Sequence, residues 1–578
     1  MSEPREAFVE LQERLDRPGT PMLDRLREVQ IERGGVGDED LDRLAGEFGW
    51  PVAAVTGTVS FYADFAERRR GRRHVRVCEG TSCFVTTLGR HVSRLEQVLG
   101  VRRGECAADG SVSLQGVRCL GYCYASPAAL DGQQPCVGEN LGGLLSDHRP
   151  AEGLAGPGAA TRSLEASPPA LPYASRGRPV VLAGLVGDEG PWEVWPRTVT
   201  GGSPGQVLAE VAAAGLRGRG GAQYPVAAKW AAAARGPTPR YVVANGDEGD
   251  PGSFCDRLLL ESDPHRVLEG LALAGFATGA RHGLVLVRSE YPAAAIRMRS
   301  AVVEARAGGH LGRSVHGSDV DFDVEIMEGG GSYVAGEETA LLHTLQGLRG
   351  DARSRPPYPT SRGFLGRPTT VNNVETLATV PWVVRHGGAA YARLGQPGEP
   401  GTKLVSLNQR FRRPGVYEVE FGVPLRHLVD GLGGGLRGPH TLRAVQIGGP
   451  LGGMLTPDRL DLPLLARALV DAGVALGHGS LVAIDSTVPA AALLRHVWAF
   501  GAAESCGACT PCRVGTRRGL ELAEQAGEPS QAAAALAAQQ PLLDVMAVAS
   551  LCGFGRGVAG AVRSLVRAYS DDLRRGVA

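Results

Sequence analysis

The chain has 578 residues, more than one hydrophobic core can organise, so several domains are expected. Its 61 basic and 61 acidic residues balance, which excludes the charge excess typical of proteins that bind nucleic acid or acidic membrane surfaces. Composition is 43% apolar and 21% charged, and no apolar run approaches the ~20 residues of a membrane span, so a cytoplasmic globular protein is predicted.

The first part of the chain predicts two small folded regions and a linker. Residues 1–72 are expected to form a helical lead-in, because LDRLREVQIER has helical apolar spacing and GDEDLDRLAGEFG starts with acidic residues and ends at glycine. Residues 73–144 combine the strands HVRVC and SVSLQGV with the helix TLGRHVSRLEQVLG, which indicates a compact α/β module. Residues 145–178 are rich in Pro, Gly, Ala and Ser and predict a linker.

Three further regions follow. Residues 179–398 alternate strands such as YVVAN and GLVLVRS with helices and glycine turns, which favours a parallel α/β domain with a nucleotide-like ligand. Residues 399–490 contain the strands VYEVEFG, RAVQIGG and SLVAID around a short helix and predict a small β-rich module. Residues 491–578 have helical spacing in AAALLRHVWAF and PLLDVMAVASL, so a terminal helical bundle is expected.

Eight of the eleven cysteines form two groups with metal-ligand spacing. Three thiolates stand on one turn and a fourth lies 40 residues on, the usual arrangement for a [4Fe–4S] cluster, with structural zinc as the alternative. These four are Cys506, Cys509, Cys512 and Cys552. The second group has two close pairs that suit a [2Fe–2S] centre, with a disulfide pair as the alternative. It consists of Cys78, Cys83, Cys119 and Cys123, whereas Cys106, Cys136 and Cys255 stand alone and are given no function.

A glycine loop in GLRGRGGAQYPVAAKW indicates a phosphate or flat-ring site. Gly218, Gly220 and Gly221 let backbone amides approach a ligand without interference from a Cβ. Lys229 follows this loop, and it is one of only two lysines among the 61 basic residues, the other being Lys403. A compact ammonium retained there suits a phosphate, although an incidental surface lysine is the alternative.

Two acidic segments extend this prediction. NGDEGDPGSFCDR places Asn245, Asp247, Glu248 and Asp250 after the strand YVVA, where open α/β sheets bind ligands, and a metal site is the alternative there. GGGSYVAGEETALL places Glu337 and Glu338 after Gly336 at a probable helix start. Helix capping explains one glutamate, so the pair indicates a binding site.

Jointly, the motifs ESCGACTPCR, GLRGRGGA, GEETALL and VNNVET resemble a known family. They are similar to two fused subunits of the peripheral arm of respiratory complex I, and to the diaphorase subunits of NAD-reducing hydrogenases and NAD-dependent formate dehydrogenases. Residues 8–144 resemble the thioredoxin-like [2Fe–2S] subunit. Residues 179–578 resemble the flavoprotein, with a Rossmann-like FMN/NADH domain, a ubiquitin-like β-grasp (SLBB) domain and a helical [4Fe–4S] domain.

The resemblance implies the ligands and the electron path. FMN would contact Gly218, Arg219, Gly221, Lys229, Asn245, Asp247, Gly336, Glu337, Asn372 and Asn373. NADH would lie over the flavin and touch Gly220, Ala222, Tyr224, Asp250, Tyr333, Glu338, Arg355 and Tyr358. Hydride would pass between NAD(H) and FMN, and single electrons would pass to the [4Fe–4S] cluster, with the [2Fe–2S] cluster as a side store. No side-chain acid or base is assigned, because the flavin carries the chemistry.

The chain departs from the family on the dinucleotide side. Gln223-Tyr224 stands where Gly-Phe is usual, Ala232 replaces an aromatic residue, and Asp250, Arg355 and Tyr358 replace Glu, Lys and Phe. An electron-transfer subunit without productive NAD binding is therefore the second hypothesis, and a zinc-filled scaffold is the third. The fusion in one chain favours a soluble NAD-linked dehydrogenase over complex I. A formate dehydrogenase is expected as the complex, with a hydrogenase or complex I as alternatives.

Overall fold

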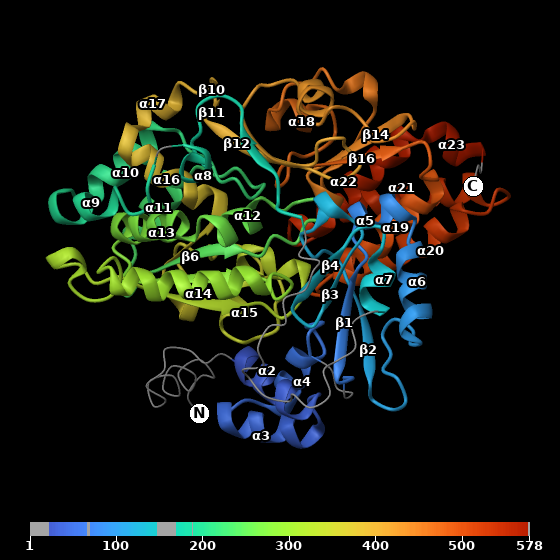
Figure 1. The fold of residues 1–578 in the computed structure, drawn as a ribbon, viewed down its shortest axis with the longest axis horizontal. Helices are drawn as coiled ribbons and strands as arrows, with labels where there is room; N and C mark the ends of the chain where they lie inside the picture. Colours follow the sequence, from blue (N-terminus) through green and yellow to red (C-terminus); the bar gives the residue numbers. More distant parts are fainter. Residues whose placement is uncertain (1–21, 66–69, 147–168, 188, 576–578) are drawn as a thin grey trace.

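The computed structural model describes residues 22–65, 70–146, 169–187 and 189–575 (Figure 1). The two helices predicted in the lead-in are confirmed as α2 (Met22–Arg33) and α3 (Asp38–Phe48), followed by α4 (Val52–Val59). Helix α3 ends where Gly49 takes a left-handed conformation, with φ of 65°. Residues 1–21 of the predicted lead-in lie outside the described residues.

A four-stranded sheet forms the centre of what we call the cysteine module, residues 70–146. Its strand order is β2-β1-β3-β4, with β1 (Arg73–Cys78) parallel to β2 (Val112–Val117) and antiparallel to β3 (Ala128–Asp131), and with β4 (Gln134–Val137) at the edge. Helices α5 (Thr81–Thr87), α6 (Arg90–Leu99) and α7 (Leu141–Ser146) complete it. The helix predicted from Thr87 begins only at Arg90, because Leu88 and Gly89 have φ of 54° and 79°.

The parallel sheet predicted in the middle of the chain is present. Its order is β8-β7-β6-β9, all parallel, formed by β6 (Tyr241–Gly246), β7 (His282–Val287), β8 (Asp323–Glu328) and β9 (Thr369–Asn373). Val242 and Val243 enter different apolar clusters, so both faces of the sheet are buried, as the continuous apolar strands require. We call this region the parallel-sheet domain. Its helices are α8 (Ala183–Val186), α9 (Trp195–Gly201), α10 (Pro204–Ala213), α11 (Val226–Ala234), α12 (Cys255–Ser262), α13 (Pro264–Thr278), α14 (Pro292–Ala307), α15 (Glu338–Leu345), α16 (Val374–His386) and α17 (Gly388–Ala392).

A second, mixed sheet has the order β15-β14-β16-β12-β13-β5. Its strands are β5 (Tyr173–Ser175), β12 (Thr402–Leu407), β13 (Gly415–Glu420), β14 (Leu442–Ile447), β15 (Gly453–Leu455) and β16 (Ser480–Asp485), and α18 (Ala466–Asp471) is the predicted short helix. The linker predicted over 145–178 needs a correction, because β5 pairs in parallel with β13. A three-residue edge strand is too short to show a period of two in the sequence.

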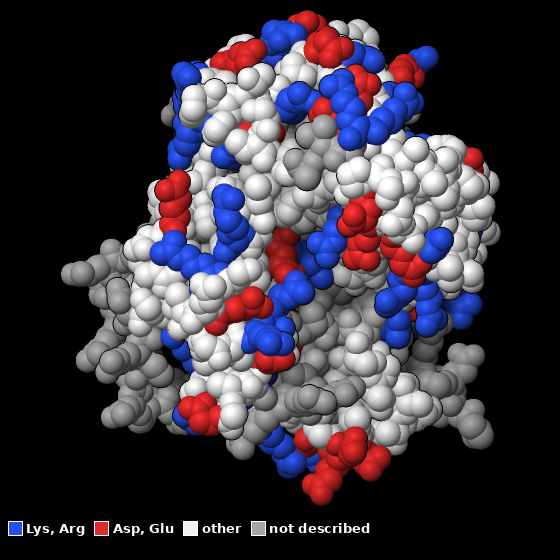
Figure 2. Space-filling model, turned by 90° about the vertical axis from the view of Figure 1, so that its right-hand side faces the viewer, with Lys and Arg blue, Asp and Glu red and all other residues white. Residues whose placement is uncertain are grey.

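The C-terminal bundle consists of α19 (Ala490–Glu504), α20 (Thr510–Ala526), α21 (Ala532–Ala549), α22 (Gly553–Ala568) and α23 (Ser570–Arg575). Its helices pack closely around Trp498, since a Cβ on Gly519 would lie 2.3 Å from the Trp498 ring. By length and composition alone α21 is apolar enough to cross a membrane, but it packs against α20 and α22 here. Basic and acidic side chains intermingle on this side of the molecule (Figure 2), in keeping with the balanced charge.

Buried polar groups join the parallel-sheet domain to the mixed sheet. Glu418 of β13 accepts hydrogen bonds from the N–H groups of residues 180, 181 and 182, at 2.8 to 3.0 Å. Arg219 donates to the Tyr391 hydroxyl at 2.6 Å, and its guanidinium lies 4.7 Å from the centre of the Phe421 ring. Lys403 of β12 pairs with Glu375 of α16, and both side chains are almost fully buried, 1% and 0% exposed. Lys403 and Glu375 thus compensate each other's charge across the junction, whereas Glu418 and Arg219 are satisfied there by hydrogen bonds.

Replacing Lys403 by Ala is expected to destabilise the protein by about 3–5 kcal/mol, because the Glu375 carboxylate would stay buried without its cation. Thermal unfolding measures this, and the double variant Lys403→Met with Glu375→Gln is the matched control. The melting temperature of the double variant should be closer to that of the original protein than the melting temperature of Lys403→Ala is. Equal losses in both would show that the loss of packing, and not the unpaired charge, causes the effect.

Candidate functional site

The structure brings the first predicted cysteine group together at two helix N-termini. Cys509 directly precedes α20 and Cys552 directly precedes α22, each in the N-cap position. The positive ends of these helices therefore face the sulfurs and favour thiolates. Cys506, Cys512 and Cys552 are buried and Cys509 is partly exposed. Two polar groups approach the sulfurs: the Leu551 N–H lies 3.4 Å from Cys509 Sγ and the Ser505 hydroxyl 3.2 Å from Cys512 Sγ.

These thiols are costly to ionise without a metal. Burial raises the pKa of Cys512 to about 12, with the hydrogen bond to Ser505 opposing the rise and the neighbouring Cys509, Cys552 and Cys506 contributing to it. Burial also raises the pKa of Cys552. A cationic iron–sulfur core would remove this cost, so the donor set fits the expected cluster.

The second cysteine group is also assembled. All four sulfurs belong to residues that are 2% exposed or less, at the end of β1, in α5 and in the loop after β2. Cys119 Sγ lies 3.7 Å from Cys123 Sγ, and the N–H of Gly121 donates to Cys119 Sγ at 3.4 Å. The neighbouring thiols of Cys119 and Cys83, together with burial, raise the pKa of Cys78 well above its usual value. All eleven cysteines, which lie within the described residues, are free thiols, so no disulfide competes with metal binding.

Side chains that the sequence analysis did not identify dock the cysteine module onto the parallel-sheet domain. Arg257 lies 3.7 Å from the centre of the Tyr122 ring and donates to the carbonyl of Gly121 at 3.0 Å. Gly121 leaves no space for a Cβ, which would lie 2.6 Å from the Tyr291 ring. The second cysteine group thus sits against residues 248–257. Tyr122 lies inside RCLGYC and Arg257 ends NGDEGDPGSFCDR, but no sequence signal pairs them.

Three of the predicted binding segments converge at the carboxyl edge of the parallel sheet. Asn245 at the end of β6 and Asn373 at the end of β9 are register partners. The Asn245 amide donates to the carbonyl of Gly336 at 2.9 Å, and a Cβ on Gly336 would lie 2.9 Å from the carbonyl oxygen of Asp247. This edge is where doubly wound sheets bind ligands.

The glycine loop closes against the same edge. Gly218 N–H donates to the Tyr224 carbonyl at 3.0 Å, Gly221 has φ of 105°, and a Cβ on Gly220 would lie 3.1 Å from Asn373 Cβ. Gln223, where the family usually has glycine, has φ of 52°, a left-handed conformation that favours glycine. The loop therefore retains a glycine-type conformation at the cost of strain at Gln223.

Lys229 and Asn372 lie below the glycine loop, and we call these two residues the floor of the site. Lys229 Nζ donates to the Val371 carbonyl at 2.9 Å and lies 3.9 Å from a Glu338 oxygen, and burial lowers its pKa. The side-chain oxygen Oδ1 of Asn372 accepts a hydrogen bond from Trp230 Nε1 at 3.0 Å, whereas the side-chain nitrogen Nδ2 is buried without a partner. An unused buried donor costs free energy unless a ligand accepts from it, so the floor fits a bound cofactor.

Three predicted side chains already have partners within the protein. The Arg219 guanidinium reaches Tyr391 and the Pro400 carbonyl, so only its backbone faces the loop. Glu248 accepts from the first N–H groups of α12, and Glu337 accepts from Thr339 N–H and Ala340 N–H as the N-cap of α15. Their proposed contacts with a cofactor would therefore run through the backbone or through an oxygen that is shared with a helix end.

Some of the predicted dinucleotide residues lie at the outer side of this edge, whereas Asp250 and Tyr333 lie further in. Tyr224 and Tyr358 are 54% and 56% exposed, beside the exposed Ala222, and Arg355 pairs with Glu338. The Tyr333 hydroxyl donates to Asp250 at 2.5 Å. Burial raises the pKa of Asp250 to about 6, and the bond from Tyr333 opposes this rise.

Tyr333 also connects this edge to the first cysteine group. Its ring packs on Phe500 and Phe554, with centroid distances of 5.0 and 5.6 Å, and Phe554 follows Cys552 by two residues. The sheet edge therefore lies against both cysteine groups, since the second group packs on residues 248–257.

Comparisons with known proteins agree with this arrangement. Family models match residues 9–137 (thioredoxin-like [2Fe–2S] ferredoxin), 211–382 (Nuo51 FMN-binding domain) and 492–576 (NADH-ubiquinone oxidoreductase-F iron-sulfur binding region). The chain is 36% identical to the NADP-reducing hydrogenase subunit HndC of Solidesulfovibrio fructosivorans, over 65% of this chain and 76% of that protein. It is 39% identical to an NADH-quinone oxidoreductase subunit of Escherichia coli (strain K12), over 55% of this chain and 72% of that protein.

A solved structure matches nearly the whole chain. This is a chain from the crystal structure of NAD+-reducing [NiFe]-hydrogenase in the H2-reduced state, with a TM-score of 0.83 and 31% identity. The match covers 96% of this chain and 92% of that chain. The arrangement of the cysteine module, both sheets and the bundle is thus shared.

Replacing Cys552 by Ser is expected to remove about four iron atoms per chain, because three cysteines cannot close a [4Fe–4S] cluster. Iron and acid-labile sulfide analysis measures this, and Cys136→Ala, a buried cysteine outside both groups, is the control. Unchanged iron in Cys552→Ser would rule out Cys552 as a cluster ligand.

Asp247 is expected to make the folded protein less stable as the pH rises. Burial raises its pKa to about 8, although Arg288 opposes this rise. A carboxyl with a raised folded pKa favours folding below its unfolded pKa of about 4, and that contribution is lost as the pH approaches 8. Asp247→Asn should therefore raise the melting temperature of the deflavinated protein more at pH ~8 than at pH ~5. Asp571→Asn, at a 75% exposed side chain, should show no such difference, and equal behaviour of the two variants would contradict the assignment.

Proposed function

The chain belongs to the family of FMN- and iron–sulfur-binding flavoprotein subunits of NADH-quinone oxidoreductases and NAD(P)-reducing hydrogenases. From this premise we propose which of its residues bind each ligand. It is an oxidoreductase subunit with FMN, [2Fe–2S] and [4Fe–4S] regions, and its partners are other subunits of a complex. We propose that it exchanges a hydride with NAD(H) and passes single electrons onward.

The observation that carries this proposal is the position of the sheet edge between the two cysteine groups. One group docks on the edge through Arg257 and Tyr122, and the other approaches through Tyr333 and Phe554. A bound FMN supplies the conversion between two-electron and one-electron transfer. A cofactor bound at this edge would lie beside both clusters and could exchange electrons with either of them.

The residues of the chain hold and orient the ligands in this proposal. The glycine loop, with Lys229 below it, would hold the FMN phosphate, because a compact ammonium and backbone N–H groups suit an anion. Asn245, Asn372, Asn373 and Asp247 would orient the ring system, and the unused Asn372 amide would gain an acceptor. The cysteines in the two groups would hold the [2Fe–2S] and [4Fe–4S] clusters.

The nicotinamide would lie at the outer side, over Gly220, Ala222 and Tyr224. Tyr224 and Tyr358 offer exposed stacking faces, and Arg355 and Glu338 offer charged groups for the ribose and phosphates. Asp250, held by Tyr333, would line the inner end of this site.

We further propose a soluble NAD-linked formate dehydrogenase as the complex, in the cytoplasm, where eleven free thiols stay reduced. The fusion of the [2Fe–2S] and flavoprotein regions in one chain supports a soluble dehydrogenase. A hydrogenase is the second candidate, and the 96% coverage of this chain by the NAD+-reducing [NiFe]-hydrogenase chain favours it. Co-purification from the native host distinguishes them: molybdenum or tungsten in the complex supports the first, and nickel supports the second.

Lys229→Ala is expected to lower FMN affinity at least about tenfold, because the floor loses its only ammonium. Flavin content and fluorescence titration measure this. Arg235→Ala, at a position directly after the same helix, is the control and should bind FMN normally. If both variants bind FMN like the original protein, Lys229 does not contact the phosphate.

NADH is expected to bleach the flavin absorption band of the loaded protein and to support ferricyanide reduction. A protein that holds FMN but stays inert to both NADH and NADPH would overturn the hydride-exchange proposal. That result would instead favour an electron-transfer subunit without productive nicotinamide binding.

A further inference from the structure

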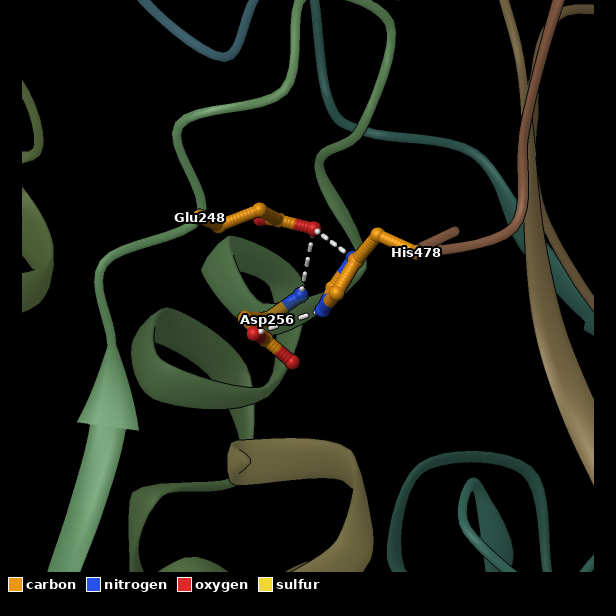
Figure 3. A group of neighbouring side chains, drawn as sticks. All are labelled: Glu248, Asp256 and His478. Carbon is orange, nitrogen blue, oxygen red and sulfur yellow. Dashed lines mark hydrogen bonds and ion pairs between the residues drawn. The ribbon is translucent and has the colours of Figure 1, made fainter. Parts of the chain in front are cut away.

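His478 lies between two buried carboxylates, Glu248 and Asp256 (Figure 3). Its Nδ1 is 3.1 Å from a Glu248 oxygen and its Nε2 is 3.0 Å from an Asp256 oxygen. The three side chains are 8%, 0% and 1% exposed, respectively. His478 belongs to the mixed sheet, two residues before β16, whereas both acids belong to the parallel-sheet domain. The triad therefore crosses the junction between the two.

The surroundings indicate a charged histidine. Both ring nitrogens lie within ion-pair distance of a carboxylate oxygen, although Nδ1 forms no hydrogen bond of good geometry. Burial acts to lower the pKa of His478, but Asp256 and Glu248 raise it well above its usual value. An imidazolium donates from both nitrogens and leaves no lone pair for a metal ion. The triad is thus better described as an ion triad than as a metal site.

The triad sets the position of Asn373. The Asn373 amide nitrogen donates to Asp256 at 2.7 Å and lies 2.9 Å from His478 Nε2. The side-chain oxygen Oδ1 of Asn373, the N-cap residue of α16, accepts a hydrogen bond from the N–H of Thr376 at 3.2 Å. Asn373 also forms the wall against Gly220 of the glycine loop.

Glu248 and Asp256 have few other cations within reach. Glu248 accepts the N–H groups of residues 255, 256 and 257, and Asp256 accepts the N–H of Glu375 at 3.3 Å. These neutral donors satisfy the lone pairs but do not neutralise two charges. Without the imidazolium, two carboxylates would share a buried space, which is strongly unfavourable.

We propose that His478 is a positioning residue of the flavin site: as an imidazolium it lies between Glu248 and Asp256 and offsets one of their two negative charges, and through Asp256 it fixes Asn373 against the glycine loop. The mixed sheet then contributes to the FMN site indirectly, because His478 acts through Asp256 and Asn373 and does not itself contact the cofactor. This inference rests on the proposed function, since it assumes that FMN binds beside Asn373.

The test uses the full-length, cluster-containing protein after removal of flavin, with FMN as the titrant. His478→Gln is expected to weaken FMN binding about tenfold or more while iron content stays unchanged. His440→Gln, at an exposed histidine of the same region, is the matched control and should bind FMN normally. Normal FMN affinity in folded His478→Gln would overturn the inference, whatever the melting temperature of the variant.

A double-mutant cycle separates positioning from a general loss of packing. If His478 acts through Asn373, Asn373→Ala and His478→Gln should each weaken FMN binding, and the double variant should be no weaker than the worse single one. Losses that add fully would overturn the inference, because they would show independent effects.

Two further outcomes keep the test decisive. If His478→Gln does not fold, the pair His478→Gln with Asp256→Asn removes one charge of each sign and is expected to fold and bind FMN within a few-fold of the original. A folded double variant with no affinity would overturn the inference. If the original protein itself binds no FMN, the proposed function fails, whereas normal binding that is insensitive to His478 defeats only the positioning role.

Discussion

Compensation of buried charge across the junction between the parallel-sheet domain and the mixed sheet underlies much of this structure. Lys403 meets Glu375, Glu418 meets three backbone N–H groups, and His478 meets Glu248 and Asp256. A charge taken out of water is costly unless a partner is held in place, so each pair requires both domains in one arrangement. Because the carboxyl edge of the parallel sheet, where we propose that FMN binds, lies beside this junction, the arrangement that satisfies the charges also shapes the proposed site.

The two cysteine groups are held by different means. In the bundle, two sulfurs precede helices, so the helix ends contribute positive potential. In the cysteine module, the sulfurs are almost fully enclosed. They lie beside the loop of Gly121, which packs on Tyr291 and accepts a hydrogen bond from Arg257, both of the parallel-sheet domain.

Both lysines of the chain occupy positions where a compact ammonium is enclosed. Lys403 is buried against Glu375, and Lys229 reaches Val371 and Glu338 below the glycine loop. Arginine supplies every other basic position and needs more space for its planar group. The rarity of lysine therefore marked one expected ligand site and one structural ion pair, and only the structure distinguishes them.

The sequence by itself determined the two cysteine groups, the glycine loop and the order of strand-rich and helical regions, because these depend on local spacing. Cys506, Cys509 and Cys512 share one turn, the glycines of residues 218–221 share one loop, and the apolar strands of the parallel sheet are continuous runs. Only the tertiary structure decided which charged residues serve the fold. Glu248 and Glu337 stand in motifs that indicate ligands, yet each caps a helix, and His478 stands in no motif at all. Their partners lie up to 230 residues away, from Glu248 to His478, and the burial that gives these contacts their strength exists only once the domains have packed.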